Sequence, residues 1–516
     1  MYLTYGLNKW SRLAPDRTAL VCEGRITSFR ALQDRVARVA GMLRDKGLAE
    51  GDRVAILSLN SDRAVELMLG TVWAAGVANN LNIRWAAPEL AYAVNDCGAR
   101  ILALDAAFAK HLPALTAQCP GLEHVLYLGD GEPPEGTDSA EHLLQQSRPI
   151  PEANTDPHRA AVINYTGGTT GRSKGVMMSH AAFTHAAAAL QGDRFFLEGQ
   201  CASLVTPLFH VTGLSAVLMN MAYGNPVVVL PAFEPVAAMR LFEAERVTHA
   251  VMVPTMIQML VEHPDFDRYH LGRLKYIRYG GSPISEALLA RIMEKLPQAQ
   301  LCQVYGQTEI MPLTVLRDED HSPEAVRRGV TRSAGRATPY VEVFAMDEDD
   351  RPLPPGGVGE IAARGLNAMM GYWNEPALTA ETQDGWTIHT GDVGYFDADG
   401  YLYLVDRKKD MIVTGGENVY STEVENALAQ HADVLACAVV ARPDERWGET
   451  VHACVVLREG AAAGEAELQA HCRELIANYK LPRSIEFMDE LPLTGAGKVN
   501  KASLRERLST GAPTTA

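Results

Sequence analysis

The sequence predicts an α/β fold, with a large, multi-subdomain N-terminal α/β domain and a small, mobile C-terminal α+β domain. Over roughly the first 400 of the 516 residues, short β-rich runs alternate with helical patterns, which is typical of helices packed on largely parallel sheets. The remainder of the chain carries a separate alternation of helices and strands. A composition of 47% hydrophobic and 21% charged residues is that of an ordinary globular enzyme with a sizeable core.

In the large domain, strands are predicted from short runs rich in apolar and β-branched residues. They cover Arg53–Leu57, Ile101–Leu104, His124–Leu128, Val227–Leu230, His249–Val253, Lys275–Tyr279 and Gln300–Val304. Helices are predicted over Phe29–Lys46, Arg63–Ala75 and Ser285–Lys295. The most apolar stretch, about residues 204–233, is interrupted by prolines and glycines, so we expect buried core there and no membrane span.

The pattern changes near the charged run Asp406–Asp410, where we expect a hinge. The predicted divisions are residues 1–406 for the large domain, 407–410 for the hinge and 411–516 for the small domain. Elements of the small domain are helices near Ser421–Gln430 and Glu465–Asn478, and strands near Ala436–Ala441 and Ala453–Leu457. A run of charges is usually only a solvated surface, but its position between two globular patterns favours a hinge.

Charge and cysteine usage narrow the function. The 47 basic and 63 acidic residues give a net charge of −16, which disfavours nucleic acid and anionic membranes as partners. Positive charge must therefore be concentrated locally if the ligand is a polyanion. The eight cysteines include no CxxC pair, and the N-terminal segment lacks the pattern of a signal peptide. We expect reduced thiols and a cytoplasmic location, and the oligomeric state stays open, with a homodimer as one option.

The segment Thr166–Gly175 is the most informative in the chain. It contains four glycines, three threonines, a serine and one lysine, between the apolar runs Ala160–Ile163 and Val176–Met178. Glycines let backbone N–H groups approach a ligand, while hydroxyls and a lysine donate to phosphate oxygens. A Walker loop requires lysine directly after its second glycine, which this segment lacks. We therefore predict a different phosphate-binding loop that joins two strands; a flexible turn is the plainer alternative.

Tyr305-Gly306-Gln307-Thr308-Glu309 follows the predicted strand Gln300–Val304 and brings a hydroxyl and a carboxylate to a strand end. Ligand sites of α/β sheets form at such ends. With phosphates nearby, the single carboxylate of Glu309 suits Mg²⁺, which takes few protein carboxylates together with phosphate oxygens. A capped helix start is the alternative explanation of the same residues.

Four further segments carry weaker signals. Tyr279–Pro283 has a strand-then-glycine form that could present backbone edges to a flat ring, and Thr390–Asp392 offers a carboxylate after a turn for two ribose hydroxyls. Pro207–His210 places a histidine in an apolar stretch, where a histidine is more often a satisfied core residue. Pro492–Lys498 presents a lysine on a glycine-rich loop, where a surface lysine is the plain alternative.

Taken together and in this order, these segments resemble the acyl-adenylate-forming superfamily, which comprises acyl-CoA synthetases, adenylation domains and firefly luciferase. The similarity runs from about Phe29 to Lys501, and the ordered set of motifs is highly specific. Gly415–Tyr420, followed by Glu423 and Glu425, is similar to the start of the family's mobile C-terminal domain.

The resemblance implies the roles of individual residues. The residues implied to hold the β- and γ-phosphates of ATP are Thr166, Gly167, Gly168, Thr169, Thr170, Gly171 and Lys174. The residues implied to form the adenine and ribose sites are Gly281, Ser282, Pro283, Tyr305, Gly306, Gln307, Asp392 and Arg407. In the reaction, Thr308 is implied to contact the α-phosphate and the acyl carboxylate, Glu309 to hold Mg²⁺, and Lys498 to bridge the acyl carboxylate and the α-phosphate during adenylation. His210 is implied to line the acyl pocket, and Gly416 to lie along the pantetheine tunnel. Lys409 is the implied hinge residue.

The family's loop usually reads Thr-Ser-Gly-Thr-Thr-Gly-x-Pro-Lys-Gly, and this chain departs from it twice. Gly167 stands in the serine position and Ser173 in the proline position. Loss of a hydroxyl and of a fixed φ is expected to loosen the loop and weaken its phosphate contacts. The threonines and Lys174 remain, so activity is expected.

The resemblance implies an acyl-CoA synthetase that uses ATP, Mg²⁺ and coenzyme A to convert a carboxylic acid into an acyl-AMP and then a thioester. The apolar stretch around Leu204–Met221 favours an uncharged acyl group, with a medium- or long-chain fatty acid first and an aryl or cinnamic acid next. A stand-alone adenylation enzyme that loads a carrier protein, a luciferase-like oxygenase and a non-catalytic nucleotide sensor are the other hypotheses. The presence of Glu309 and Lys498 argues against the sensor.

Overall fold

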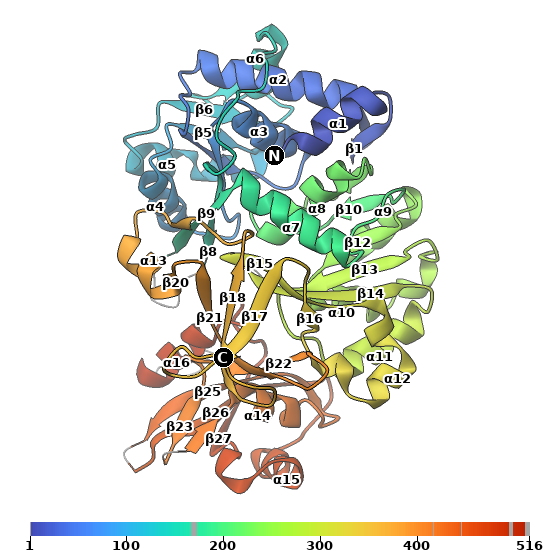
Figure 1. Ribbon diagram of the computed structural model, residues 1–516, viewed down its shortest axis with the longest axis vertical. Coiled ribbons are helices and arrows are strands. Elements are labelled where there is room, and N and C mark those ends of the chain that lie inside the picture. Colours follow the sequence, from blue (N-terminus) through green and yellow to red (C-terminus); the bar gives the residue numbers. More distant parts are fainter. Residues whose placement is uncertain (1, 167–172, 416, 445, 495–498, 511–516) are drawn as a thin grey trace. The chain divides into compact units, whose positions relative to one another are not determined.

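The computed structural model describes residues 2–166, 173–415, 417–444, 446–494 and 499–510 (Figure 1). The chain folds as two compact units. The first contains residues 1–343 and 363–388, and the second contains residues 344–362 and 389–516.

A nine-stranded sheet forms one half of the first unit. Across the sheet the strands are β16 (Arg336–Ala337), β15 (Ile310–Leu316), β14 (Gln300–Gln307), β13 (Tyr276–Gly280), β12 (His249–Met252), β10 (Ala202–Leu204), β11 (Val227–Val229), β1 (Thr18–Cys22) and β2 (Arg25–Ser28). Pairing from β14 to β1 is parallel, and both edges are antiparallel. The carboxyl ends of the parallel strands therefore all point to the same side of the sheet. The predicted nucleotide-binding segments follow β10, β13 and β14 on that side.

An eight-stranded sheet forms the other half of the first unit. Its strands are β19 (Gly371–Tyr372), β9 (Lys174–Ser179), β8 (Ala160–Thr166), β4 (Val77–Asn80), β3 (Arg53–Leu57), β5 (Ile101–Leu104), β6 (His124–Tyr127) and β7 (Asp138–Ser139). The strands from β8 to β7 pair in parallel, whereas β9 pairs antiparallel with both β8 and β19. Helices connect the parallel strands, as the alternating sequence pattern predicts.

Some helices of the first unit begin where a polar side chain satisfies a free backbone N–H group. Ser28 accepts a hydrogen bond from Ala31 N at the start of α2, and Ser61 does the same for Ala64 N at the start of α3. The α-helices are α1 (Tyr5–Leu13), α2 (Phe29–Asp45), α3 (Asp62–Trp73), α4 (Ala87–Cys97), α5 (Leu112–Gln118), α6 (Ala140–Gln146), α7 (His180–Gly192), α8 (Val211–Ala222), α9 (Pro235–Ala244), α10 (Pro254–Val261), α11 (Glu286–Lys295), α12 (Pro323–Arg327) and α13 (Pro376–Thr382).

A third sheet has the order β17 (Val341–Met346), β18 (Gly359–Gly365), β21 (Thr387–Phe396) and β20 (Gln383–Asp384), and β22 (Leu402–Arg407) pairs with β21. In the second unit, β21 and β22 are antiparallel, with Asp392 opposite Arg407. This register places a carboxylate and a guanidinium side by side on neighbouring strands.

The fourth sheet lies wholly in the second unit. Its strands are β24 (Glu417–Val419), β23 (Ile412–Thr414), β26 (Gly448–Leu457) and β25 (Val434–Asp444), with β27 (Ser484–Phe487) paired to β26. The helices of this unit are α14 (Ser421–Leu428), α15 (Glu465–Leu475) and α16 (Lys501–Thr510). Apolar side chains of α14, α15 and the sheet form a separate core around Val424, Leu428 and Val439.

The predicted α/β fold class is confirmed. Strands Arg53–Leu57 and Ile101–Leu104 have the predicted bounds, and the apolar stretch at 204–233 is the buried segment β10–α8–β11. The strand predicted over Gln300–Val304 is longer than expected because its last residues pair with β15 in a hairpin. No helix within the described ranges is both long and apolar enough to cross a membrane. The hinge at residues 407–410 stays a prediction.

Candidate functional site

The phosphate-loop segment joins two strands, as predicted. It leaves β8 at Thr166 and enters β9 at Lys174, and these two residues lie opposite each other in the antiparallel ladder. The predicted contacts of Gly167, Gly168, Thr169, Thr170 and Gly171 lie outside the described residues. The described strands hold Thr166 and Lys174 at adjacent positions, from which a hydroxyl and an ammonium group can serve the same ligand.

Side-chain contacts among three residues link this loop to Glu309, the carboxylate predicted to bind Mg²⁺. The Lys174 ammonium nitrogen lies 5.4 Å from the ring centroid of Tyr372. The hydroxyl of Tyr372 donates a hydrogen bond to Glu309 Oε1 at 2.8 Å. Tyr372 is on β19, which pairs directly with β9, so the two sheets of the first unit present Lys174 and Glu309 to one region.

The pKa of Tyr372 is raised, first because the ring is buried and second because the Glu309 carboxylate is adjacent. The hydroxyl therefore stays protonated at neutral pH and serves as a donor to Glu309. Sequence reasoning missed Tyr372, because no local pattern distinguishes it, and only the structure shows that a glycine is needed before it. Gly371 has φ +129°, and a Cβ there would come within 2.8 Å of Thr379, so only glycine allows this approach.

Thr308 and Glu309 form the two-residue turn between β14 and β15, since Gln307 pairs with Ile310. The alternative of a capped helix start is therefore wrong: the chain reverses into an antiparallel strand. The backbone oxygen of Glu309 accepts a hydrogen bond from Met369 N at 2.7 Å, which fastens the turn to the segment before β19. Glu309 is half-buried, and its carboxylate, which accepts the Tyr372 hydrogen bond, is the kind of hard oxygen donor that suits Mg²⁺.

The predicted adenine-site residues lie at the carboxyl ends of two adjacent parallel strands. Gly280 on β13 pairs with Val304 on β14, and a Cβ on Gly280 would lie 2.2 Å from Val304 O. After Gly280 the chain continues through Gly281, which has φ +82°, to half-buried Ser282 and exposed Pro283. On the neighbouring strand, half-buried Tyr305 follows Val304. The close strand approach brings the Gly281–Pro283 segment and Tyr305 to the same sheet edge, as the sequence predicts for a flat ring site. Gly306 and Gln307 continue β14 along that edge.

His210 lies at the amino end of α8, the apolar helix after β10. Its Nδ1 is 3.4 Å from Thr212 N and 3.1 Å from Thr212 Oγ1, so the ring caps the helix. The preceding Phe209 carbonyl accepts a hydrogen bond from Asn164 Nδ2 on β8 at 3.1 Å. The histidine thus has a local structural role, and its predicted place in an acyl pocket stays a prediction.

Asp392 and Arg407 form an ion pair in the second unit, 2.9 Å from Nε to Oδ1. Asp392 is 6% exposed, whereas nearly half of the Arg407 side chain is exposed. Asp392 lies within β21 rather than after a turn, which corrects the sequence prediction. The apparent turn signal is Gly391, which has φ +69° and accepts a hydrogen bond from Lys408 N.

Two predicted residues of the second unit, Gly416 and Lys498, lie outside the described residues. Their flanks are described. Leu493 and Val499 form an antiparallel bridge, and Asn500 N donates to Pro492 O at 2.7 Å. The residues on either side of the Lys498 segment are therefore held together by backbone hydrogen bonds.

Comparison with known proteins finds matches along nearly the whole chain. Residues 7–373 match the family described as AMP-binding enzyme, and residues 423–498 match the AMP-binding enzyme C-terminal domain. A feruloyl-CoA synthase from Amycolatopsis sp is 37% identical over 97% of this chain and 99% of its own. The fatty acid–[acyl-carrier-protein] ligase ScoC of Streptomyces coeruleorubidus is 36% identical over 96% and 94%. Among solved structures, the amide bond synthetase McbA from Marinactinospora thermotolerans has a TM-score of 0.88 and 31% identity, over 97% and 99% of the two chains.

Proposed function

Because the chain belongs to the AMP-binding enzyme family, within the acyl-adenylate-forming superfamily, and its relatives include AMP-forming acid–thiol ligases, we propose that it is a CoA ligase for an uncharged, largely apolar carboxylic acid. The main support for this proposal is that Tyr372 contacts both Lys174 and Glu309 within the first unit. It joins a cation beside the phosphate loop to a carboxylate suited to a divalent metal.

In the proposed reaction, the acid's carboxylate attacks the α-phosphorus of ATP and pyrophosphate leaves. Two anions must approach each other, so the site has to supply positive charge in a protein whose net charge is −16. Lys174 would neutralise the β- and γ-phosphates, and Thr308 would donate to the α-phosphate or the acyl carboxylate. Mg²⁺, held by Glu309, would add charge neutralisation on the phosphate oxygens.

The adenine of ATP would contact a glycine-containing backbone segment, and the ribose would contact a carboxylate held by an ion pair. Gly281–Pro283 and Tyr305 would flank adenine at the shared edge of β13 and β14. Asp392 would accept hydrogen bonds from the ribose hydroxyls, with Arg407 holding that carboxylate in place through their 2.9 Å contact. In the second half-reaction the thiol of coenzyme A attacks the acyl carbonyl and AMP leaves; Gly416 would border the pantetheine.

For the acid, a medium- or long-chain fatty acid is the first candidate. The support is helix α8, which follows His210, contains no charged residue and buries ten of its twelve residues. An aryl acid is the second candidate, and the similarity to feruloyl-CoA synthase favours it. Transfer to a carrier protein in place of coenzyme A is favoured by the similarity to ScoC.

A pyrophosphate-release screen tests this proposal. Fatty acids from hexanoate to palmitate, ferulate and cinnamate, and a dicarboxylate series would each be given with ATP, Mg²⁺ and either coenzyme A or a pantetheinylated carrier protein. We expect release with an apolar monocarboxylate and thioester formation with coenzyme A, and a large loss of both in Glu309→Gln. If no acid releases pyrophosphate, the proposed function is wrong; preference for ferulate or for the carrier protein would select one of the alternatives.

A further inference from the structure

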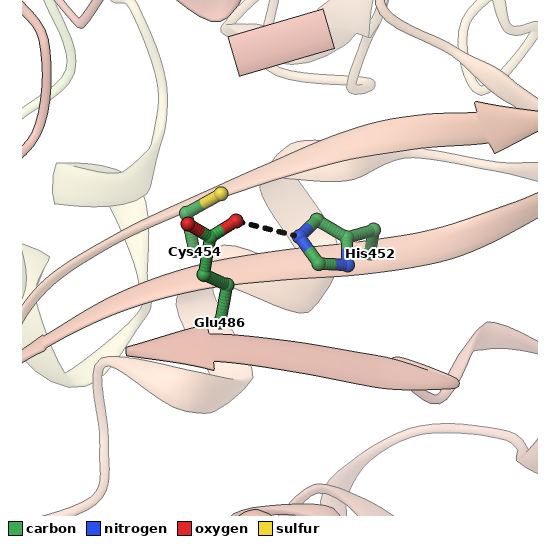
Figure 2. Close-up of side chains that lie close together, drawn as sticks. All are labelled: His452, Cys454 and Glu486. Carbon is green, nitrogen blue, oxygen red and sulfur yellow. Dashed lines mark ion pairs between the residues drawn. The ribbon is translucent and has the colours of Figure 1, made fainter. Parts of the chain in front are cut away.

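Three side chains of the second unit, none of which has been assigned a role above, meet on one face of the fourth sheet. They are His452 and Cys454 on β26 and Glu486 on β27. His452 and Cys454 are two residues apart in a strand, so they point to the same face. The parallel pairing of β26 with β27 places Cys454 opposite Glu486. Figure 2 shows the Glu486 carboxylate beside Cys454 and an ion-pair line from it to the His452 ring.

The geometry points to a binding site for a thiophilic divalent metal ion, with Zn²⁺ as the expected ion and His452, Cys454 and Glu486 as its protein ligands. One ligand atom from each residue lies within 4.8 Å of the others. Tetrahedral zinc separates its nitrogen, oxygen and sulfur ligands by about 3.4–3.6 Å, calculated from the usual bond lengths. The ligand atoms that lie farthest apart would therefore have to close by up to about 1.2–1.4 Å.

His452 is oriented for such a role. It is 4% exposed, and its Nδ1 lies 2.7 Å from Ser484 Oγ, the residue opposite it on β27. Its Nε2 is buried without a hydrogen-bond partner and lies 3.7 Å from Glu486 Oε2, too far for a hydrogen bond. Metal-binding histidines characteristically engage the other ring nitrogen in a hydrogen bond, which fixes the ring.

The two oxygens of Glu486 have different surroundings. Oε1 accepts a hydrogen bond from Arg507 on α16 at 3.0 Å, whereas Oε2 faces His452. The carboxylate can thus keep its contact with Arg507 while Oε2 binds a cation. Glu486 is partly exposed, so a water molecule can reach the fourth position of a tetrahedral ion. The thiol of Cys454 would lose its proton to solvent on binding.

The ligand types decide the class of ion. A thiolate, an imidazole and one carboxylate favour Zn²⁺ or Co²⁺ over Mg²⁺ or Ca²⁺, which prefer oxygen alone. The site is therefore chemically distinct from the proposed Mg²⁺ position at Glu309.

The test is a titration of the metal-stripped, full-length protein with Co²⁺ in excess Mg²⁺ and without ATP. We expect one Co²⁺ per chain, a sulfur-to-cobalt charge-transfer band, and displacement by Zn²⁺. The band should disappear in Cys454→Ala and persist in Cys437→Ala, a matched control. Cys437 is on β25 opposite Val455, so its side chain lies on the other face of the same sheet.

Two variants of β27 residues test the site independently if Cys454→Ala does not fold. Glu486→Gln should weaken the affinity while leaving every thiol in place. Ser484→Ala should weaken it about 10–100-fold through loss of the histidine's orientation. Absence of a one-to-one Co²⁺ complex in the unmodified protein, a band that survives Cys454→Ala, or unchanged affinity in Glu486→Gln would each overturn the proposal.

Discussion

Replacing Tyr372 with phenylalanine tests whether this tyrosine positions the proposed magnesium carboxylate. The substitution removes one hydroxyl and leaves the ring beside Lys174. It deletes the 2.8 Å hydrogen bond to Glu309 Oε1, in which a neutral hydroxyl donates to a carboxylate. Such bonds contribute about 1.5–3 kcal/mol. At about 1.4 kcal/mol per factor of ten, the apparent Mg²⁺ requirement should rise about 10–100-fold.

The assay is ATP–pyrophosphate exchange as a function of Mg²⁺ at fixed ATP and acid. We expect the Tyr372→Phe variant to need more Mg²⁺ and to regain most of its rate at saturation, because Glu309 itself is intact. Conversion of supplied acyl-AMP and coenzyme A to thioester should be unchanged, since pyrophosphate has already left.

Tyr279→Phe is the matched control. Its hydroxyl is also buried and hydrogen bonded, to His321 Nε2 at 2.8 Å, but it does not contact Glu309. An unchanged Mg²⁺ dependence in Tyr372→Phe, or the same shift in Tyr279→Phe, would refute the positioning role. Equal loss of both half-reactions would instead indicate general damage to the fold.

Two further predictions concern the lysine of the second unit and acid stability. Lys498→Ala should lower adenylation by about 10²–10³-fold yet spare thioester formation from supplied acyl-AMP, measured as separate half-reactions; equal losses would contradict a lysine that acts only in adenylation. Burial lowers the pKa of both His180 and His321 to about 4, so the unfolded chain binds more protons than the folded protein below about pH 6.5. Stability should therefore fall as the pH drops from about 6.5 towards 4, by about 1.4 kcal/mol per pH unit for each histidine. Urea unfolding of the unmodified protein and of His321→Asn at pH 7 and pH 5 checks this, and an equally steep decline in the variant would contradict it.

Much of the first unit could be predicted because its strands are short, buried and flanked by clear helices. Arg53–Leu57 and Ile101–Leu104 are read directly from short apolar runs, and both strands lie inside the eight-stranded sheet. The end of β14 was harder to place, since Tyr305–Gln307 has no strand pattern of its own. Those residues are extended because β15 returns beside them, and the partner strand is a property of the fold.

The candidate site divides in the same way. Thr166, Lys174, Glu309 and Asp392 stand in local motifs whose residue types already indicate phosphate, metal and ribose chemistry. Tyr372 is one of 17 tyrosines and lies in a two-residue strand, so no local pattern distinguishes it. Its importance comes from the pairing of β19 with β9, which sets it between Lys174 and Glu309.

The sequence by itself determined the α/β class, the two kinds of structural block and the family, because these depend on hydrophobic period and on short motifs that must keep their residue types. Only the tertiary structure decided which carboxylate meets which donor. Asp392 faces Arg407, and Glu486 faces Cys454, through strand registers that join residues distant along the chain. Register is set by the packing of whole strands on their cores, and no single motif encodes it.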